Sequence, residues 1–167
     1  MAITREKKAQ LLEQLKEVVT NATSIAFVHF KGVSVAEATE LRSALKKEGV
    51  RYMVAKKTLL KKTLAEAKVE GELPELDGEV AFAYLPKEAG EDMTAPARNL
   101  NEFVKKFKDR LTFLGGVVEN RFISKSEVET VASIPPTPVL RGMFVNVINS
   151  PIQRFAIALN AIAEKRG

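Results

Sequence analysis

The sequence predicts an α/β protein of the α+β type: a two-layer domain with one mixed sheet packed by helices, followed by a protruding C-terminal helical segment. Short β-prone runs alternate with helical patterns up to residue 133, which is typical of a single sheet with helices packed on it. Pro135, Pro136 and Pro138 then interrupt the chain, since each proline fixes φ and removes a backbone donor. We therefore expect a domain over 1–134, a Pro-rich hinge over 135–138 and a helical segment over 139–167.

The first half of the domain is expected to contain three helices and two strands. A helix is predicted over 4–22, where apolar residues recur with helical spacing. The run SIAFVHF at 24–30 is β-prone, and so is the alternating run at 51–55. Between them a capping-box pattern begins at Ser34 and opens a helix that ends at Gly49. We expect Val35, Ala38, Leu41 and Leu45 to point inward, and Leu60 and Leu64 to support a short helix after the second strand.

The second half of the domain is expected to add a strand over 80–85 and a helix over about 92–108. A strand over 111–118 and its hairpin partner at 122–123 follow, with a turn at Glu119-Asn120. The pair Gly115-Gly116 lies in this strand, where a β-bulge is the expected reason for glycine. A second capping box begins at Ser124 and opens a helix through about residue 133. The sequence does not fix the order of the strands.

Composition excludes several classes of function. The chain has 46% hydrophobic residues, enough for a real core, and no Cys, so disulfides, thiolate zinc sites and thiol catalysis are excluded. His29 is the only histidine and lies in an apolar strand, so a two-His metal site cannot form. No Walker-type phosphate loop occurs. We expect no enzyme, no metal, no cofactor and no small-molecule substrate. Without an apolar signal region or a membrane-spanning run, a cytoplasmic protein is expected.

Positive charge is concentrated near the N-terminus. Residues 1–62 carry 13 basic and 6 acidic residues, a net +7, whereas residues 63–134 carry a net −5 and residues 135–167 a net +3. A polyanion is therefore expected to contact the N-terminal third. The basic candidates are Lys7, Lys8, Lys31 with Gly32, Arg42, Lys46, Lys56, Lys57, Lys61 and Lys62.

Two of these groups, Lys31-Gly32 and Lys56-Lys57, directly follow predicted strands, and the ends of strands often share one edge of a sheet. Lysine at the start of a helix is unfavourable because the helix macrodipole is positive there, and a bound anion would remove that cost. Aromatic residues make up only 7% of the chain, so contacts to folded RNA through phosphate and 2′-OH groups fit better than base stacking on single strands. The alternative is that the lysines are merely solvated.

The C-terminal segment carries one apolar stripe. Its large residues are spaced 4, 4, 3, 4 and 3 apart, and they are Phe144, Ile148, Ile152, Phe155, Leu159 and Ile162. Ser150-Pro151 suits a helix start, so the segment is either two helices or one helix kinked there. An exposed stripe of this size predicts docking of partner helices along it. The alternative is that the segment folds back and completes the core of the domain.

The stretch FVHFKGVSVAEATELRSALKKEGVRYMVAKKTLLKKTL and the tail NSPIQRFAIALNAIAEKRG resemble the bacterial large-subunit ribosomal protein ten family, the stalk-base proteins. The resemblance implies binding of large-subunit rRNA next to ribosomal protein eleven. Carried onto this chain, the RNA contacts fall on Lys31, Gly32, Arg42, Lys56, Lys57, Thr58 and Lys61. It also implies that the C-terminal helix carries dimers of the acidic stalk protein (seven/twelve), which recruits translational GTPases, and the length of the tail suggests two dimers. One departure is Lys57, where the family usually has Asn.

Two other classes of protein compete with this interpretation. A non-ribosomal RNA-binding assembly factor related to the stalk base would share the front domain but lack the apolar stripe, which this chain has. A protein-scaffolding module with solvated lysines would bind RNA weakly, with a shallow dependence on salt.

Overall fold

The computed structural model describes residues 5–67, 69–71, 74, 76, 78–87, 92–107 and 110–166, and the side chains of 5–9 and 166 lie outside that description. The chain divides into two compact units, Met1–Ile134 and Pro135–Gly167. Among the described residues, no helix has both the length and the apolar character that crossing a membrane requires.

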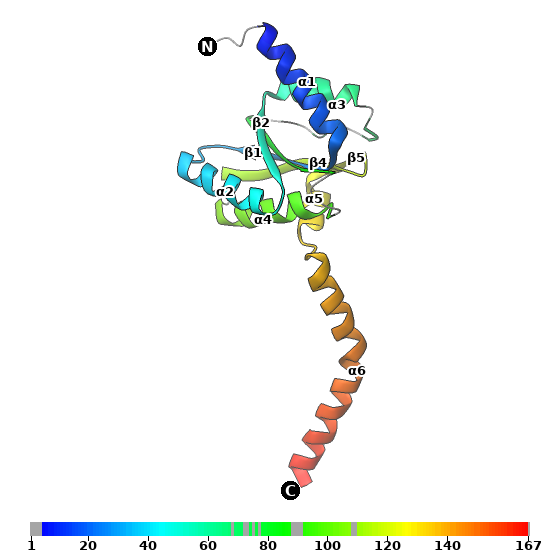
Figure 1. The fold of residues 1–167 in the computed structure, drawn as a ribbon. Coiled ribbons are helices and arrows are strands. Elements are labelled where there is room, and N and C mark those ends of the chain that lie inside the picture. The colour runs from blue at the N-terminus through cyan, green and yellow to red at the C-terminus, as the bar shows by residue number, and fades with distance from the viewer. Residues whose placement is uncertain are drawn as a thin grey trace. The chain divides into compact units, whose positions relative to one another are not determined.

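The first unit alternates helices with strands along the chain (Figure 1). In order, its elements are α1 (Arg5–Asn21), β1 (Ala22–Phe30), α2 (Val35–Lys47), β2 (Arg51–Ala55), α3 (Lys57–Glu66), β3 (Val80–Pro86), α4 (Ala95–Phe107), β4 (Leu111–Val118), β5 (Arg121–Ser124) and α5 (Lys125–Ala132). The strands form one sheet in the order β2-β3-β1-β4-β5. The predicted fold class, a single sheet packed by helices and followed by a C-terminal helix, is confirmed.

The sheet differs from the expected mixed one, because all four pairings between these strands are antiparallel. The only parallel pairing in the described chain is an isolated bridge between Glu70 and Arg121. A hairpin joins β4 to β5 directly, whereas the other neighbouring strands are separated along the chain by at least one helix. The sequence shows these helices but not which strands they bring together.

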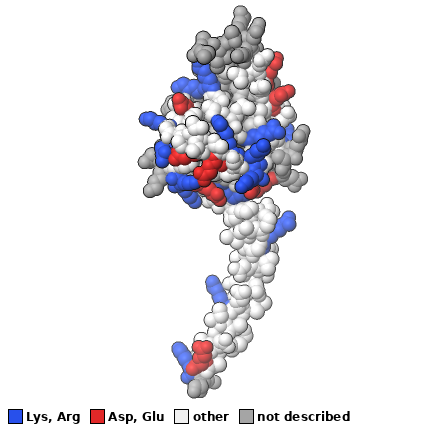
Figure 2. All heavy atoms as spheres, turned by 60° about the vertical axis from the view of Figure 1, so that its left-hand side comes forward, with Lys and Arg blue, Asp and Glu red and all other residues white. Residues whose placement is uncertain are grey.

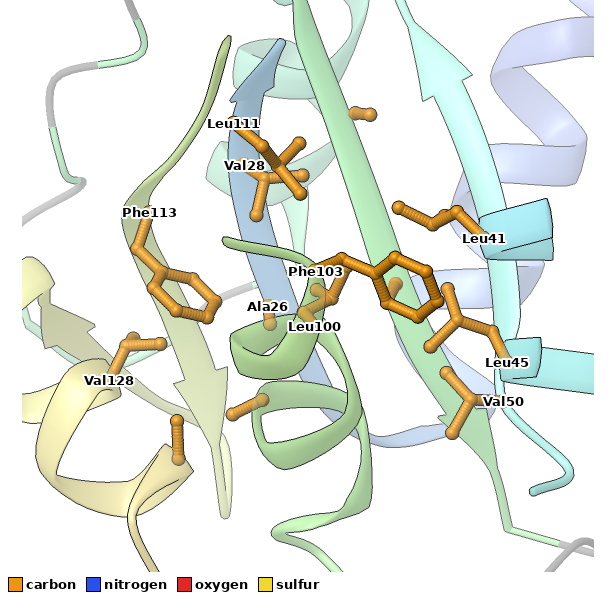
Figure 3. Close-up of a cluster of buried hydrophobic side chains, with 14 of the residues drawn as sticks. Ala26, Val28, Leu41, Leu45, Val50, Leu100, Phe103, Leu111, Phe113 and Val128 are labelled. Atoms are coloured by element: carbon orange, nitrogen blue, oxygen red, sulfur yellow. The ribbon is translucent and has the colours of Figure 1, made fainter. Parts of the chain in front are cut away.

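Helices cover both faces of the sheet, α1 and α3 on one side and α2, α4 and α5 on the other (Figure 1). The central strands explain this arrangement, since β1 has five consecutive buried residues and β3 has six. Side chains alternate between the two faces of a strand, so such runs require cover on both. Ile25 and Phe27 belong to one core cluster and Ala26 and Val28 to the other, which Figure 3 shows.

The capping boxes, the helix stop and the hairpin turn predicted from the sequence are present in the structure. Both capping boxes are present, with Ser34 opening α2 and Ser124 opening α5. Gly49 has a φ of 74°, the left-handed conformation that ends a helix. Glu119 and Asn120 both have positive φ, which matches the twist of a two-residue β-hairpin turn.

The glycine pair in β4 sits at the predicted bulge. The β1–β4 register passes from Phe27↔Gly115 to Val28↔Phe113, so one extra residue, Leu114, lies in β4. Gly116 closely approaches the neighbouring strand, because a Cβ atom there would lie 2.7 Å from the carbonyl oxygen of Ile25. The two glycines are therefore structural.

Two details of the helices differ from the sequence prediction. Val35 was expected to point inward but is 85% exposed, because it is the first residue of α2 and the helix makes its buried contacts through Leu41 and Leu45. The helix expected over 92–108 begins at Ala95. Asp92 precedes it in a turn in which the Asp92 carboxylate accepts from the Thr94 N–H (3.1 Å). The expected end at residue 108 lies outside the described residues.

The second unit contains one helix, α6 (Thr137–Arg166), which continues through Pro151. Of the two alternatives left open by the sequence, the structure therefore contains the single helix. It begins two residues before the expected segment, and Pro138 lies in its first turn. Proline is tolerated there because the first N–H groups of a helix have no partner within it.

Candidate nucleic-acid interface and apolar helix

The pairing of the strands brings two lysine-bearing strand ends to one edge of the sheet. β1 and β2 are both antiparallel to β3, so they run in the same direction with β3 between them, as their arrows in Figure 3 show. Val80, the first residue of β3, pairs with His29 of β1 and with Ala55 of β2. Lys31 and Lys56 therefore follow the two strand ends that flank the start of β3. We call this the lysine edge.

The loop after β1 has a fixed backbone. The Lys31 N–H donates to the carbonyl oxygen of Arg110 at 2.9 Å, and the Phe30 N–H donates to that of Glu79 at 3.2 Å. Gly32 has a φ of +66°, and nothing lies within 4 Å of the position a Cβ would take. The glycine is therefore required by the turn, and the space beside it is open to a ligand.

The start of α3 presents positive charge and free backbone donors. Lys56 occupies the N-cap position without a side-chain cap hydrogen bond, so it leaves orphan N–H groups in the first turn. The inward face of the helix buries Leu59, Leu60, Thr63 and Leu64. The other residues of its first two turns are exposed, namely Lys57, Thr58, Lys61 and Lys62. Positions three or four apart share a helix face, so the exposed lysines form one continuous basic surface from Lys56 onward.

The remaining predicted residues lie in three different places. Arg42 is exposed on α2, with its guanidinium carbon 5.9 Å from the centre of the Tyr52 ring on β2, so it flanks the edge strand. Lys46 lies in the last turn of α2. This turn precedes the start of β2, so Lys46 is at the end of the sheet opposite the lysine edge. Lys7 and Lys8 fall in α1, but their side chains lie outside the described residues.

The predicted lysines whose side chains the structure describes take no part in the ion pairs found there. Those pairs are Lys16–Glu66, Arg98–Asp92, Lys106–Glu40 and Arg110–Glu37. In Figure 2, basic and acidic side chains are interspersed over the visible face of the first unit. The lysine edge is thus a local concentration of charge rather than part of a uniformly basic surface.

Two charged residues at this edge were missed by the sequence reasoning. Arg110 joins Lys31 through the backbone hydrogen bond described above, because β4 begins opposite the end of β1. Glu79 directly precedes β3 and lies between the two strand ends. No local pattern marks either residue, and only knowledge of the strand pairing would have placed them here.

The positive charge of Arg110 is partly neutralised by an ion pair with Glu37. Its Nη1 lies 3.2 Å from Oε1 of Glu37. The backbone N–H of Ser34 is the main cause that lowers the pKa of Glu37, followed by the Ser34 hydroxyl, and Arg110 adds to it. Glu37 is therefore charged at neutral pH and offsets part of the charge of Arg110.

His29 has a structural role in this geometry. Its Nδ1 lies 3.0 Å from the carbonyl oxygen of Glu79, and since a carbonyl only accepts, Nδ1 carries the proton. The ring also lies against Gly78, where a Cβ atom would be 2.3 Å from Cε1 of the imidazole. Among the described residues, no group of three or more His, Cys, Asp or Glu side chains could hold a metal ion.

The predicted stripe of α6 is exposed along its whole length. The six residues are 51% to 70% exposed, and they are Phe144, Ile148, Ile152, Phe155, Leu159 and Ile162. Other large apolar side chains of the helix are exposed as well: Val139, Leu140, Met143, Val145, Val147 and Ile157. In Figure 2 this helix is white over most of its surface. The apolar surface is thus wider than the single stripe predicted from the sequence.

The sequence of α6 contains a short internal repeat that includes residues of the apolar stripe. Phe144, Ile148 and Asn149 recur as Phe155, Leu159 and Asn160, eleven residues later. Eleven residues make three turns of helix with a remainder of only about 20°, and they advance about 16.5 Å along the axis. Two similar apolar surfaces therefore follow one another on nearly the same side of α6.

Comparison with known proteins gives matches to both units. The model of the family described as ribosomal protein L10 matches residues 3–105, and the model described as the ribosomal protein uL10 C-terminal region matches residues 135–166. The large ribosomal subunit protein uL10 of Shouchella clausii is 35% identical over 166 residues, which cover 99% of this chain and 97% of that protein. The protein of the same description from Staphylococcus aureus is 36% identical with the same coverage.

Proposed function

Because this chain belongs to the ribosomal protein L10 family, we propose that it forms the base of the large-subunit stalk. The family consists of structural, non-enzymatic proteins of the large ribosomal subunit, so the chain is a ribonucleoprotein component that serves translation in the cytoplasm. The proposal adds two specific roles. The domain over 1–134 binds large-subunit rRNA, and the segment after the hinge, over 139–167, anchors dimers of the acidic stalk protein.

One observation carries the anchoring role: a unit made of a single helix exposes twelve large apolar side chains. A single helix has no second element in its own unit to bury them, and soluble proteins rarely leave such a patch open. Partner helices docking along α6 would cover it. The repeat at Phe144 and Phe155 supports two equivalent sites, and hence two dimers, about 16.5 Å apart.

The lysine edge supports the rRNA-binding role. Three exposed lysines, Lys31, Lys56 and Lys57, surround the start of β3 beside the uncapped end of α3. Backbone N–H groups and positive charge at a helix start both favour phosphate oxygens. Thr58, Lys61 and Lys62 extend this surface, and Arg42 flanks it. Lys57, which stands where the family usually has Asn, contributes charge in place of an amide.

Anchoring is tested by native mass spectrometry of the chain mixed with the acidic stalk protein. We expect a complex that contains four copies, as two dimers, and we expect it to disappear when the chain is truncated after Ile134. Phe155→Asp should remove at least one dimer without unfolding the domain, since it places a charge in an interface. Absence of any complex with the full chain would contradict the anchoring role and favour the assembly-factor alternative.

The RNA site is tested by titrating large-subunit rRNA with the full chain at several salt concentrations. Replacing Lys56, Lys57 and Lys61 by Gln should weaken binding and reduce the salt slope by about one unit for each lost phosphate contact. A matched control replaces Lys47, Lys105 and Lys125, which are exposed outside the lysine edge. Equal affinity of the two triple variants would show that the RNA contacts lie elsewhere.

A further inference from the structure

One corner of the sheet at the lysine edge is left uncovered by the helices. Arg42 of α2 lies over Tyr52 of β2. Val54 lies two residues further along β2 and so on the same face, but it is 46% exposed. Phe30, at the end of β1, is only partly buried on that face. Helix α2 therefore covers this face of β2 at Tyr52 but leaves Val54, nearer the lysine edge, exposed.

A predominantly apolar hollow occupies this corner. It has a volume of about 630 Å³, and its lining includes Phe30 and Val54, Gly78 and Glu79 before β3, and Lys56 and Lys57. The volume falls within the range of small-ligand sites, about 300–1,000 Å³. Contacts to phosphates alone do not require an apolar surface among lysines, so the hollow calls for a ligand with an apolar face.

Glu79 is anchored through its backbone in the wall of this hollow. Its carbonyl oxygen accepts from the Phe30 N–H at 3.2 Å and from Nδ1 of His29 at 3.0 Å. The neighbouring Gly78 is in the positive-φ conformation against the His29 ring. Its side chain is exposed and lines the hollow together with Lys56 and Lys57. A carboxylate at this position repels phosphate, but it is a strong acceptor for N–H donors.

An unstacked nucleobase satisfies these features together. Its flat face is apolar and fits against Phe30 and Val54, and its amino group donates to an acceptor. Glutamate accepts from base amino groups in known recognition. The phosphates on either side of such a base carry the charge that Lys31, Lys56 and Lys57 attract. Phosphate contacts position an RNA, whereas base contacts specify its sequence.

We propose that the hollow between the ends of β1 and β2 receives one unstacked, amino-bearing nucleobase of the large-subunit rRNA, which donates to the Glu79 carboxylate. This inference rests on the proposed rRNA-binding role. To the lysines that bind phosphate it adds Glu79, which recognises the amino group of the base, and Val54, which contacts the flat face of the base. In this arrangement His29 positions the backbone of Glu79, through its hydrogen bond to the Glu79 carbonyl oxygen.

Charge removal at Glu79 distinguishes base recognition from simple phosphate binding by the direction of its effect. If the lysine edge binds only phosphates, Glu79→Gln removes a repulsive charge. The affinity for large-subunit rRNA then stays the same or increases. If Glu79 accepts from a base, the same change weakens binding, by about tenfold for one lost base contact, with the salt slope unchanged. Val54→Lys should also weaken binding although it adds positive charge, because it fills the hollow.

The experiment titrates full-length large-subunit rRNA with the full chain, with thermal melting to confirm that each variant is folded. Glu129→Gln on α5 is the matched control, since Glu129 is exposed away from this edge. Weaker binding by both Glu79→Gln and Val54→Lys, but not by the control, supports the proposal. Unchanged or tighter binding by Glu79→Gln overturns it and leaves the lysine site intact. If the wild type and the triple lysine variant bind rRNA equally, the proposed RNA site itself fails.

Chemical probing of the bound rRNA then identifies the base. One nucleotide should be protected by the wild type and become reactive with Glu79→Gln. An rRNA that is abasic at this nucleotide should bind the wild type and Glu79→Gln equally, because the contact is absent in both. If the abasic rRNA still binds the wild type about tenfold tighter than the variant, Glu79 does not contact that base and the proposal is wrong.

Discussion

Phe82 and Phe155 are the same residue type in opposite surroundings. Phe82 lies in β3, the second strand from the edge of the sheet, and is 0% exposed, whereas Phe155 lies in α6 and is 67% exposed. In the first unit, helices cover both faces of the sheet and bury almost every large apolar side chain. In the second unit there is a single helix, and its apolar side chains have nothing in that unit to pack against.

The comparison shows that apolar content predicts burial only when a second element is available to pack on. Both units have helices with regularly spaced apolar residues. In the domain that spacing produces a core, and in α6 the same spacing produces a surface for partners. The following experiments test this difference between the two units, in order of decreasing effect.

The largest difference is expected between matched phenylalanine truncations. Phe82→Ala should lower the free energy of unfolding of the domain by about 3–5 kcal/mol, because it removes a fully buried ring and leaves a cavity. Phe155→Ala should change it by less than about 0.5 kcal/mol. Urea denaturation followed by a probe in the domain measures both. A loss of several kcal/mol with Phe155→Ala would mean that α6 packs on the domain.

The next effect concerns the proline inside α6. Pro151→Ala should stabilise the helix by up to about 3 kcal/mol, because proline lacks the N–H and clashes with the preceding turn. Amide hydrogen exchange around residue 150 should slow by up to roughly a hundredfold, while exchange in the sheet stays constant. Pro138→Ala is the control, since a first-turn proline removes no intrahelical bond. Slower exchange in β1 as well would indicate that the two units are coupled.

A smaller effect is expected from a cap of the domain. In α2 the Glu37 N–H donates to the Ser34 hydroxyl at 3.3 Å, and the Ser34 N–H donates to the Glu37 carboxylate at 2.8 Å. Ser34→Ala should cost about 1 kcal/mol of domain stability. Thermal melting checks the loss, and exchange rates in α6 should not change. Val35→Ala, one residue later, should cost little because Val35 is exposed.

The smallest effect concerns pH. The pKa of Glu37 is lowered in the folded state, first by the Ser34 backbone N–H, and the pKa of Glu127 is lowered in the same way by Ser124. A carboxyl group whose pKa is lower in the folded state than in the unfolded state stabilises the fold. This contribution is fully present above the pKa of the unfolded state, about 4.3, and is lost as the pH falls through the pKa of the folded state. Acid should therefore destabilise the domain. Denaturation at pH 7 and at lower pH should show a weaker pH dependence for Glu37→Gln, and an unchanged dependence would contradict this origin.

The sequence predicted the local elements of the fold well. Both capping boxes, the stop at Gly49, the turn at Glu119-Asn120 and the bulge at Gly115 are confirmed in the structure. Each of these features depends on residues within a few positions of one another. Their physical causes, such as a capping hydroxyl or a positive φ, are therefore visible in a short window of sequence.

The candidate residues of both surfaces were also predicted from the sequence, and their roles stay predictions. Lys31 and Lys56 stood out because they follow strands, and the stripe from Phe144 to Ile162 stood out by its spacing. The sequence did not show that Val35 is exposed, because its place in the helical pattern matches that of a core residue. Nor did it show the full width of the apolar surface of α6, because residues such as Val147 and Ile157 lie outside the stripe.

What the sequence determined by itself is the set of elements, the ends marked by caps and turns, and the family to which the resemblance pointed. Only the tertiary structure decided that β3 lies between β1 and β2, and with that pairing it brought Lys31, Lys56, Arg110 and Glu79 to one edge. The reason is physical. Helix caps and turns are set by neighbours in the chain, whereas strand order is set by burial of both faces of the sheet, which involves residues 25 or more positions apart, such as Ala55 and Val80.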